Sequence, residues 1–92
     1  MSVDNSEIEK AFQKAVKRVT KSKKNNTSND IKLSLYGAYK QALCGDNMAP
    51  EPYNLFGLSE AHHKWLAWNK FKKWSSVNSM QFYIDLVNKE KL

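Results

Sequence analysis

The residue types best suited to chemistry lie in a tyrosine-rich stretch near the middle of the chain. Tyr36, Tyr39 and Lys40 share one arc of a helical wheel drawn at ~100° per residue. Two aromatic faces beside an ammonium group suit a ligand that combines a flat heterocycle with a phosphate. The same arc is also typical of a helix–helix seam from which a lysine reaches water. The wheel alone leaves both interpretations open.

Lys64 is a second unusual cation. The apolar arc of the segment around it consists of Ala61, Trp65, Trp68 and Phe71, and Lys64 falls inside that arc. An unpaired charge is costly to bury, so a lysine in this place needs a partner. An anionic ligand is one such partner. A side chain that extends past the apolar surface to water is the alternative.

Cys44, His62 and His63 suggest a Cys–His nucleophile, but the sequence offers no support for one. Nothing in it brings the cysteine and the histidines together or supplies a third group to orient them. Adjacent histidines on a helix point to different faces, so a shared metal ion is not expected. A single cysteine excludes an internal disulfide and the Cys-rich zinc patterns. We therefore predict a binding protein that is not an enzyme and has neither metal nor cofactor.

The net charge limits the class of partner. The chain has 92 residues and a formal net charge of +6, which favours a nucleic acid, an anionic membrane surface or a phosphorylated small molecule. Five cations gather on one face of the first predicted helix: Lys10, Lys14, Lys17, Arg18 and Lys21. Such a face suits nucleic-acid phosphates or anionic lipid, and it is equally typical of a solvated helix surface.

Four helices are expected to position these residues. Ser6 and Glu9 have the spacing of a capping box that begins a first helix. A second predicted helix begins at Asn29 or Asp30 and runs to about Cys44. Its expected core stripe is a single narrow arc: Ile31, Leu35, Ala38 and Ala42. This stripe is complete without the tyrosines, which are therefore free to face a ligand.

Two further helices are predicted in the second half of the chain. Ser59 can cap a third helix that reaches about Lys73, and Ser75 or Ser76 a fourth that reaches about Lys89. The core face of the fourth helix is expected at four positions, with Tyr83 at its edge: Val77, Met80, Ile84 and Val87. No strand alternation is present, so the predicted class is all-α, with one domain over residues 1–92.

The location follows from what the sequence lacks. No apolar run approaches the ~20 residues that a membrane-spanning helix needs. The first residues are polar and acidic, unlike a secretory signal peptide. We therefore expect a cytoplasmic monomer without stable membrane insertion.

Three blocks of sequence, in order, resemble the acyl-CoA-binding protein family. Residues 35–42 read Leu-Tyr-Gly-Ala-Tyr-Lys-Gln-Ala and are followed by Gly-Asp at 45–46. Residues 64–69 read Lys-Trp-Leu-Ala-Trp-Asn, and residues 80–87 read Met-Gln-Phe-Tyr-Ile-Asp-Leu-Val. The blocks match the family's Tyr-x-x-Tyr-Lys-Gln-Ala, its Lys-Trp-x-Ala-Trp-Asn and the start of its last helix.

This resemblance implies a four-helix bundle in up-down-down-up order that cradles a nucleotide and covers a thioester. It implies high-affinity binding of long-chain fatty acyl-CoA by an intracellular carrier and pool former, with no nucleic-acid partner. The implied contacts are Tyr36, Lys40 and Lys64 on the ribose 3′-phosphate, Tyr39 and Tyr83 on adenine and ribose, and Leu33 beside the acyl chain. A basic helical module that binds nucleic acid or an anionic membrane is the alternative.

The chain departs from the family pattern at three places. The loop from Gly45 to Lys64 is about two residues longer than usual, which leaves Met48 to Glu60 without a secure alignment. A position that is often basic at the end of the first helix falls near Thr20, with Lys21 beside it. Phe82 and Leu86 replace residues that are usually small or polar, which adds an apolar strip. That strip could cover lipid, contact a partner or thicken the bundle.

Overall fold

The structure, a computed structural model, describes residues 5–22, 27–53 and 59–92. The elements of this part of the chain are all helices: α1 (Ser6–Lys21), α2 (Asn29–Cys44), α3 (Glu60–Asn69) and α4 (Ser76–Glu90). The predicted all-α class is confirmed. None of these helices is long and apolar enough to cross a membrane.

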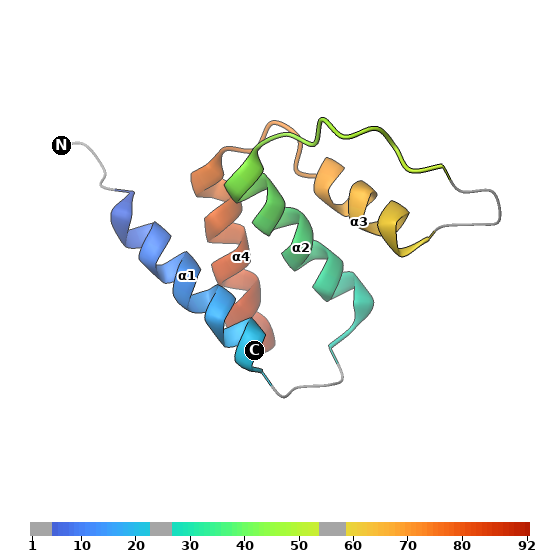
Figure 1. Ribbon diagram of the computed structural model, residues 1–92. Coiled ribbons are helices and arrows are strands. Elements are labelled where there is room, and N and C mark those ends of the chain that lie inside the picture. Colours follow the sequence, from blue (N-terminus) through green and yellow to red (C-terminus); the bar gives the residue numbers. More distant parts are fainter. Residues whose placement is uncertain (1–4, 23–26, 54–58) are drawn as a thin grey trace.

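The helices run in the up-down-down-up order that the resemblance implies (Figure 1). α1 and α4 run in the same direction, and α2 and α3 run together in the opposite one. α2 packs against both α3 and α4, and α1 packs against α4. Because α2 and α3 are parallel, the connection between them must return along their length, as the trace after Cys44 shows.

The core lies mainly among α1, α2 and α4. It includes Phe12, Ala15, Leu35, Ala38, Ala42, Phe71, Met80, Tyr83 and Val87. The predicted stripe of α2 is confirmed at three of its positions, whereas Ile31 is only half-buried. Tyr83 is 4% exposed and meets Phe12 edge-on at 5.1 Å between ring centroids. The prediction that Tyr83 lies at the edge of the core face was wrong, since Ile84 is the less buried residue.

α2 and α3 meet at a glycine. A Cβ atom on Gly37 would lie 2.3 Å from the carbonyl oxygen of Ala67, so any larger residue would separate the two helices. Ala67 is the buried residue of α3, while Ala61 is exposed and Trp65 is half-buried. The predicted apolar arc was therefore right at Phe71, which is buried, and wrong at Ala61, and it missed Ala67, the small residue that the close approach at Gly37 requires.

α2 begins at Asn29 as predicted, but the capping residues of α1 and α2 each lie one position earlier than expected. The carbonyl of Asn5 accepts from Glu9 N at 3.0 Å, so Asn5 is the N-cap and Ser6 is already helical. The predicted capping box is therefore wrong, because its glutamate stands one position too far along. Ser28 caps α2 in place of Asn29 or Asp30, and its hydroxyl accepts from Ile31 N at 3.3 Å.

The remaining caps agree with the sequence, but the end of α3 does not. The hydroxyl of Ser59 accepts from His62 N, and that of Ser75 accepts from Asn78 N. α3 ends at Asn69, well before the predicted Lys73. The residues after Asn69 form a turn instead of continuing the helix. At the end of this turn, Lys73 has a φ of 72° and its N–H donates to the Asp46 carboxylate at 2.6 Å.

Candidate functional site

Two hollows meet along α2. The α2–α3 hollow has a volume of about 730 Å³, and its lining includes Leu33, Glu60, His63 and Lys64. The α1–α2 hollow has a volume of about 360 Å³, and its lining includes Val16, Val19, Thr20, Leu35, Tyr39 and Tyr83. Lys32 and Tyr36 line both hollows. Five of the six predicted contact residues therefore line these two adjoining hollows, and Lys40 lines neither.

Lys64 extends from α3 toward α2. Its Nζ lies 5.6 Å from the centroid of the Tyr36 ring and 3.2 Å from Glu60 Oε1. The Lys64 side chain is 45% exposed, so it is not a buried charge. The argument that burial forces a partner on Lys64 was therefore wrong. A half-exposed cation that is held over a ring can still meet an anion from solution.

Lys40 extends from α2 over an aromatic ring of α3. Its Nζ lies 4.8 Å from the centroid of the Trp68 ring. That ring is itself fixed, because Trp68 Nε1 donates to the carbonyl oxygen of Gly45 at 2.8 Å. Each of the two helices thus places a lysine over an aromatic ring of the other.

The spacing of these two pairs sets the distance between the lysines. Tyr36 precedes Lys40 by four residues on α2, and Lys64 precedes Trp68 by four residues on α3. Because α2 and α3 are parallel, the two pairs lie about one helical turn apart, roughly 6 Å along the seam. Each ammonium group therefore lies over a ring at this seam, at neighbouring levels of the two helices.

Tyr39 and Tyr83 line the α1–α2 hollow from α2 and α4. Their ring centroids are 6.4 Å apart, and both rings pack against Phe12. Burial, and secondarily the neighbouring Tyr39, raises the pKa of Tyr83 to about 12. Its hydroxyl is neutral near pH 7, as that of any tyrosine with an ordinary pKa would be, and can donate a hydrogen bond. The expectation that the core stripe of α2 is complete without its tyrosines was wrong for Tyr39, because its ring packs against Phe12 and the core.

Sequence reasoning missed Lys32. This exposed lysine precedes Tyr36 by one turn, and it lines both hollows. The hydroxyl of Thr20, across the α1–α2 hollow, donates to the carbonyl oxygen of Val16 at 3.0 Å. Lys32 therefore supplies a cation to the hollow that Thr20 lines. The four-residue spacing to Tyr36 was the signal that could have identified it.

The two tryptophans of α3 hold the α2–α3 connection in place. Trp65 Nε1 donates to the carbonyl oxygen of Ala49 at 2.8 Å. The buried Asn47 donates through Nδ2 to the carbonyl oxygen of Trp65 at 3.1 Å. Together with the bond from Trp68 to Gly45, these contacts fix the connection along α3. Asn47 is a further residue that the sequence alone did not indicate.

Gln41 and Asp46 join the same end of the seam to the turn before α4. The buried Gln41 donates through Nε2 to Asp46 Oδ1 at 2.9 Å and to the carbonyl oxygen of Trp74 at 3.1 Å. The hydrogen bond from Lys73 N, followed by that from Gln41, lowers the pKa of Asp46. These two motif residues therefore support the site through backbone geometry.

The residues that suggested a nucleophile are apart. Cys44 is exposed at the end of α2, whereas His62 and His63 lie in the first turn of α3. Since the helices are parallel, these ends are opposite. His62 Nε2 lies 2.6 Å from Glu51 Oε2. Among the residues described, no group of three or more His, Cys, Asp or Glu side chains could hold a metal.

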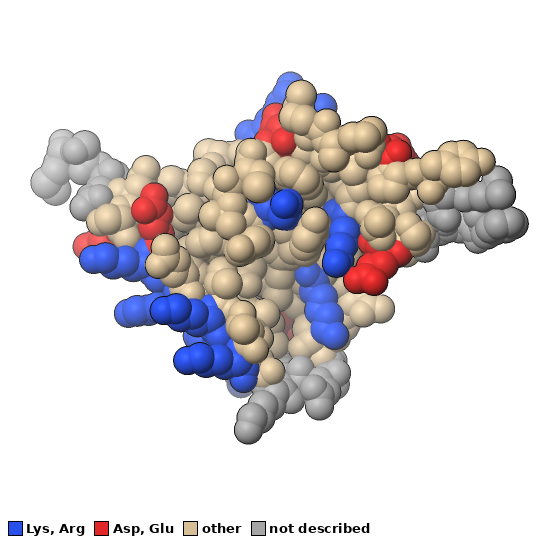
Figure 2. Space-filling model, viewed as in Figure 1, with Lys and Arg blue, Asp and Glu red and all other residues tan. Residues whose placement is uncertain are grey.

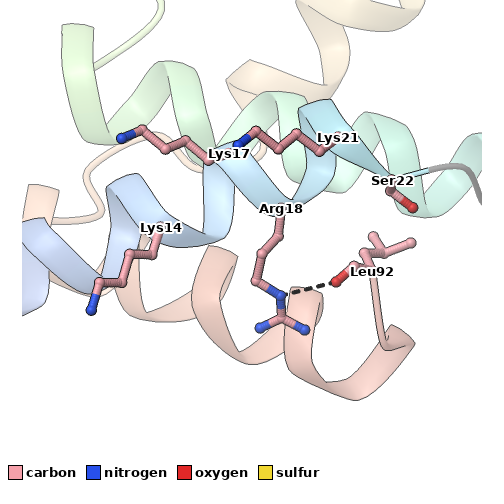
Figure 3. A pocket seen from close by; sticks show the side chains of 6 residues that line it. All are labelled: Lys14, Lys17, Arg18, Lys21, Ser22 and Leu92. Atoms are coloured by element: carbon pink, nitrogen blue, oxygen red, sulfur yellow. Dashed lines mark hydrogen bonds between the residues drawn. The ribbon is translucent and has the colours of Figure 1, made fainter.

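The basic face of α1 is a separate surface. Figure 2 shows it as the densest group of cations on this side, apart from the single lysines over α2 and α3. A shallow hollow of about 500 Å³ is lined there by Lys14, Lys17, Arg18, Lys21, Ser22 and Leu92. Arg18 turns to Leu92 O at 3.0 Å and to Asn88 Oδ1 at 2.8 Å, while Lys14 and Lys17 extend away from it (Figure 3). Arg18 thus ties α1 to the end of α4.

Comparison with known proteins finds a matching family and several relatives of this chain. The family model described as Acyl CoA binding protein matches residues 9–87. An acyl-CoA-binding protein homolog of Drosophila melanogaster is 40% identical over 80 residues, which cover 87% of this chain and 90% of the relative. An acyl-CoA-binding domain-containing protein 6 homolog of Dictyostelium discoideum is 39% identical over 88 residues, and the match spans 91% of this chain but only 29% of that longer protein.

A solved structure agrees with these relatives. The crystal structure of Oryza sativa Acyl-CoA-Binding Protein 2 superposes with a TM-score of 0.80 at 30% sequence identity. The superposition covers 89% of this chain and 88% of the rice protein. The chain belongs to the acyl-CoA-binding protein family.

Proposed function

We propose that this protein binds long-chain fatty acyl-CoA thioesters with high affinity and acts as an intracellular carrier, without turning them over. The observation that carries the proposal is the register of two lysine–ring pairs one helical turn apart on parallel helices. An anion with two charges suits this pair of ammonium groups. The ribose 3′-phosphate of coenzyme A, with about −1.5 to −2 charges near neutral pH, has that chemistry.

The other predicted contacts extend from this point. Tyr36 lies beneath Lys64, so the phosphate would meet Lys40, Lys64 and the Tyr36 hydroxyl. Tyr39 and Tyr83 offer ring faces and a neutral hydroxyl to adenine and ribose in the α1–α2 hollow. Leu33 lies in the α2–α3 hollow, where it would contact the acyl chain.

The ligand must therefore contribute through both ends. A dozen buried methylenes at ~0.8 kcal/mol each would contribute on the order of 10 kcal/mol before ordering costs. Calorimetric titration should give far tighter binding for palmitoyl-CoA than for coenzyme A or palmitate alone. An oligonucleotide serves as the competitor for the basic face and should bind weakly. If palmitate and palmitoyl-CoA bound equally, the proposal would be wrong.

We also propose that the bound thioester survives. No described residue pairs the Cys44 thiol with a histidine base, so palmitoyl-CoA should remain intact during incubation with the protein. Chromatography should detect no release of coenzyme A beyond the uncatalysed rate. Release in excess of stoichiometry that Cys44→Ser abolished would establish an enzyme. A cytoplasmic location and a monomeric state complete the proposal, and light scattering tests the second.

A further inference from the structure

We propose that the distal part of a long acyl chain passes between the N-terminal ends of α2 and α3 and lies in a second, aromatic groove. This inference rests on the proposed function and names where that ligand ends. The aromatic groove has a volume of about 580 Å³, and its apolar lining consists of Leu33, Leu66, Ala67, Phe71, Trp74 and Phe82. It extends from α2 and α3 to the turn before α4 and to α4 itself.

The groove borders the α2–α3 hollow. Asp30, Leu33 and His63 line both spaces, so the two spaces adjoin where the first turns of α2 and α3 face each other, and the proposed path of the chain crosses this border. Further along, Gly37 and Ala67 bring the helices into contact and close the seam. The N-terminal ends of the helices therefore bound the passage. Leu33, the residue expected beside the acyl chain, stands at its entrance.

The floor of the groove is an aromatic cluster that hydrocarbon would cover. Phe71, Trp74 and Phe82 meet edge-on, with ring centroids 4.9, 5.1 and 5.7 Å apart. Phe71 is buried, but Trp74 remains 41% exposed, which is unusual for so large a ring beside a core. The charged residues of the lining, Asp30 and Lys70, are exposed and stay at the rim. Apolar walls with a charged rim suit an alkyl tail.

The groove gives Phe82 a role. Both residues that add an apolar strip to α4 pack against the core, but only Phe82 also lines the groove. Long chains should consequently bind more tightly than short ones through contacts that short chains never reach. Each methylene that the groove buries should strengthen binding by up to about fourfold.

A blocking variant tests this inference. Ser34 is half-buried and lines the aromatic groove but neither of the other hollows, so Ser34→Trp should fill the groove and leave the nucleotide contacts in place. Binding of stearoyl-CoA should weaken at least about tenfold, and that of octanoyl-CoA by less than about threefold. Gln13→Trp, on the exposed side of α1, is the matched control and should change neither affinity.

The possible outcomes distinguish a failure of the proposed groove from a failure of the proposed acyl-CoA binding. If wild-type protein bound neither thioester, the proposed function would fail and the groove with it. If both thioesters bound and Ser34→Trp kept the full preference for stearoyl-CoA, the groove would be excluded while acyl-CoA binding stood.

A second measurement needs no variant. Isotope-filtered NMR with stearoyl-CoA carrying a ¹³C-labelled terminal methyl should show contacts to ring protons of Trp74 and Phe82. Contacts of that methyl to Val16 or Val19, in the α1–α2 hollow, would overturn the proposal. This result decides the matter even if Ser34→Trp does not fold.

Discussion

The protein presents cations in two places, and the α2–α3 seam differs from the basic face of α1 in how it holds them. On the seam, Lys40 and Lys64 each lie over a ring of the opposite helix, in matching register. On α1, the lysines are exposed and extend apart, and Arg18 is engaged with α4. Charge density alone would favour α1. Specific recognition depends on cations held at a fixed spacing, and the seam supplies that.

The strongest test of this difference removes the seam lysines one at a time. A charge-assisted hydrogen bond contributes ~1.5–3 kcal/mol, so Lys40→Ala and Lys64→Ala should each weaken palmitoyl-CoA binding roughly 10- to 150-fold. Because both would grip one phosphate, the double variant should be less than additive. Calorimetric titration of each variant provides the measurement.

Two controls accompany these variants. Lys17→Ala, on the basic face, should change the affinity less than about threefold, as expected for an exposed lysine. A thioester of dephospho-coenzyme A, which lacks the 3′-phosphate, should be almost insensitive to either seam substitution. Wild-type affinity of a Lys64→Ala protein that circular dichroism shows to be folded would remove Lys64 from the site.

An alkaline titration tests the buried contact between α1 and α4, where Tyr83 packs against Phe12 on the side of α1 away from its basic face. Burial raises the pKa of the Tyr83 hydroxyl from its ordinary 10.0 to about 12 in the folded protein. Ionisation of this hydroxyl therefore lowers the free energy of unfolding. The contribution of the neutral hydroxyl is complete below about pH 10 and should be lost between pH 10 and 12, in total roughly 2–3 kcal/mol. Urea unfolding of wild type and Tyr83→Phe across this range isolates the effect. Parallel pH curves for the two proteins would contradict it.

A third test opens the seam without touching a charge. Alanine normally stabilises a helix relative to glycine by up to ~1 kcal/mol. At Gly37 the added Cβ would meet the Ala67 carbonyl, so Gly37→Ala should instead lower the free energy of unfolding by about 1–3 kcal/mol. Ligand affinity should fall with it, because the lysine–ring pairs separate. Ser34→Ala, one turn earlier, should be nearly neutral in urea unfolding, and stabilisation by Gly37→Ala would show that the helices can shift apart freely.

The smallest expected effect concerns Lys32. This lysine is exposed, so Lys32→Ala should weaken palmitoyl-CoA binding by up to about fivefold at low salt. The difference from wild type should shrink in 1 M salt, where the screening length is about 3 Å. An effect as large as that of Lys40→Ala would indicate that the phosphate binds nearer to the α1–α2 hollow than proposed.

Much of the architecture could be predicted from the sequence, because the periodicity of α2 and the stop signals around it are local. Leu35, Ala38 and Ala42 lie where the wheel places them. The errors occur where tertiary contacts decide. The end of α3 depends on the Asp46 carboxylate, which lies far away in the sequence.

The candidate site shows the same limit. Lys64 was selected because an apolar arc surrounded it, yet α3 approaches Gly37 of α2 through Ala67, which lies outside that arc. The wheel also separated ligand-facing from core residues too sharply, since Tyr83 lines a hollow and is 4% exposed. Lys32 has the four-residue spacing to Tyr36, but only the structure shows that it lines both hollows. The relative register of α2 and α3 depends on tertiary contacts, and a wheel drawn for one helix does not contain them.

The parallel arrangement of α2 and α3 also bears on how the chain reaches its native state. Neighbouring helices that are antiparallel can dock as soon as a short turn closes, whereas α2 and α3 must first close the long connection anchored by Trp65 and Trp68. α1 and α4 likewise join across most of the chain, as the bond from Arg18 to Asn88 shows. Such non-local pairing slows folding relative to helical bundles with short loops. The lysine–ring register should therefore be among the last features to form, so a partly folded chain would have its helices before it could hold a ligand.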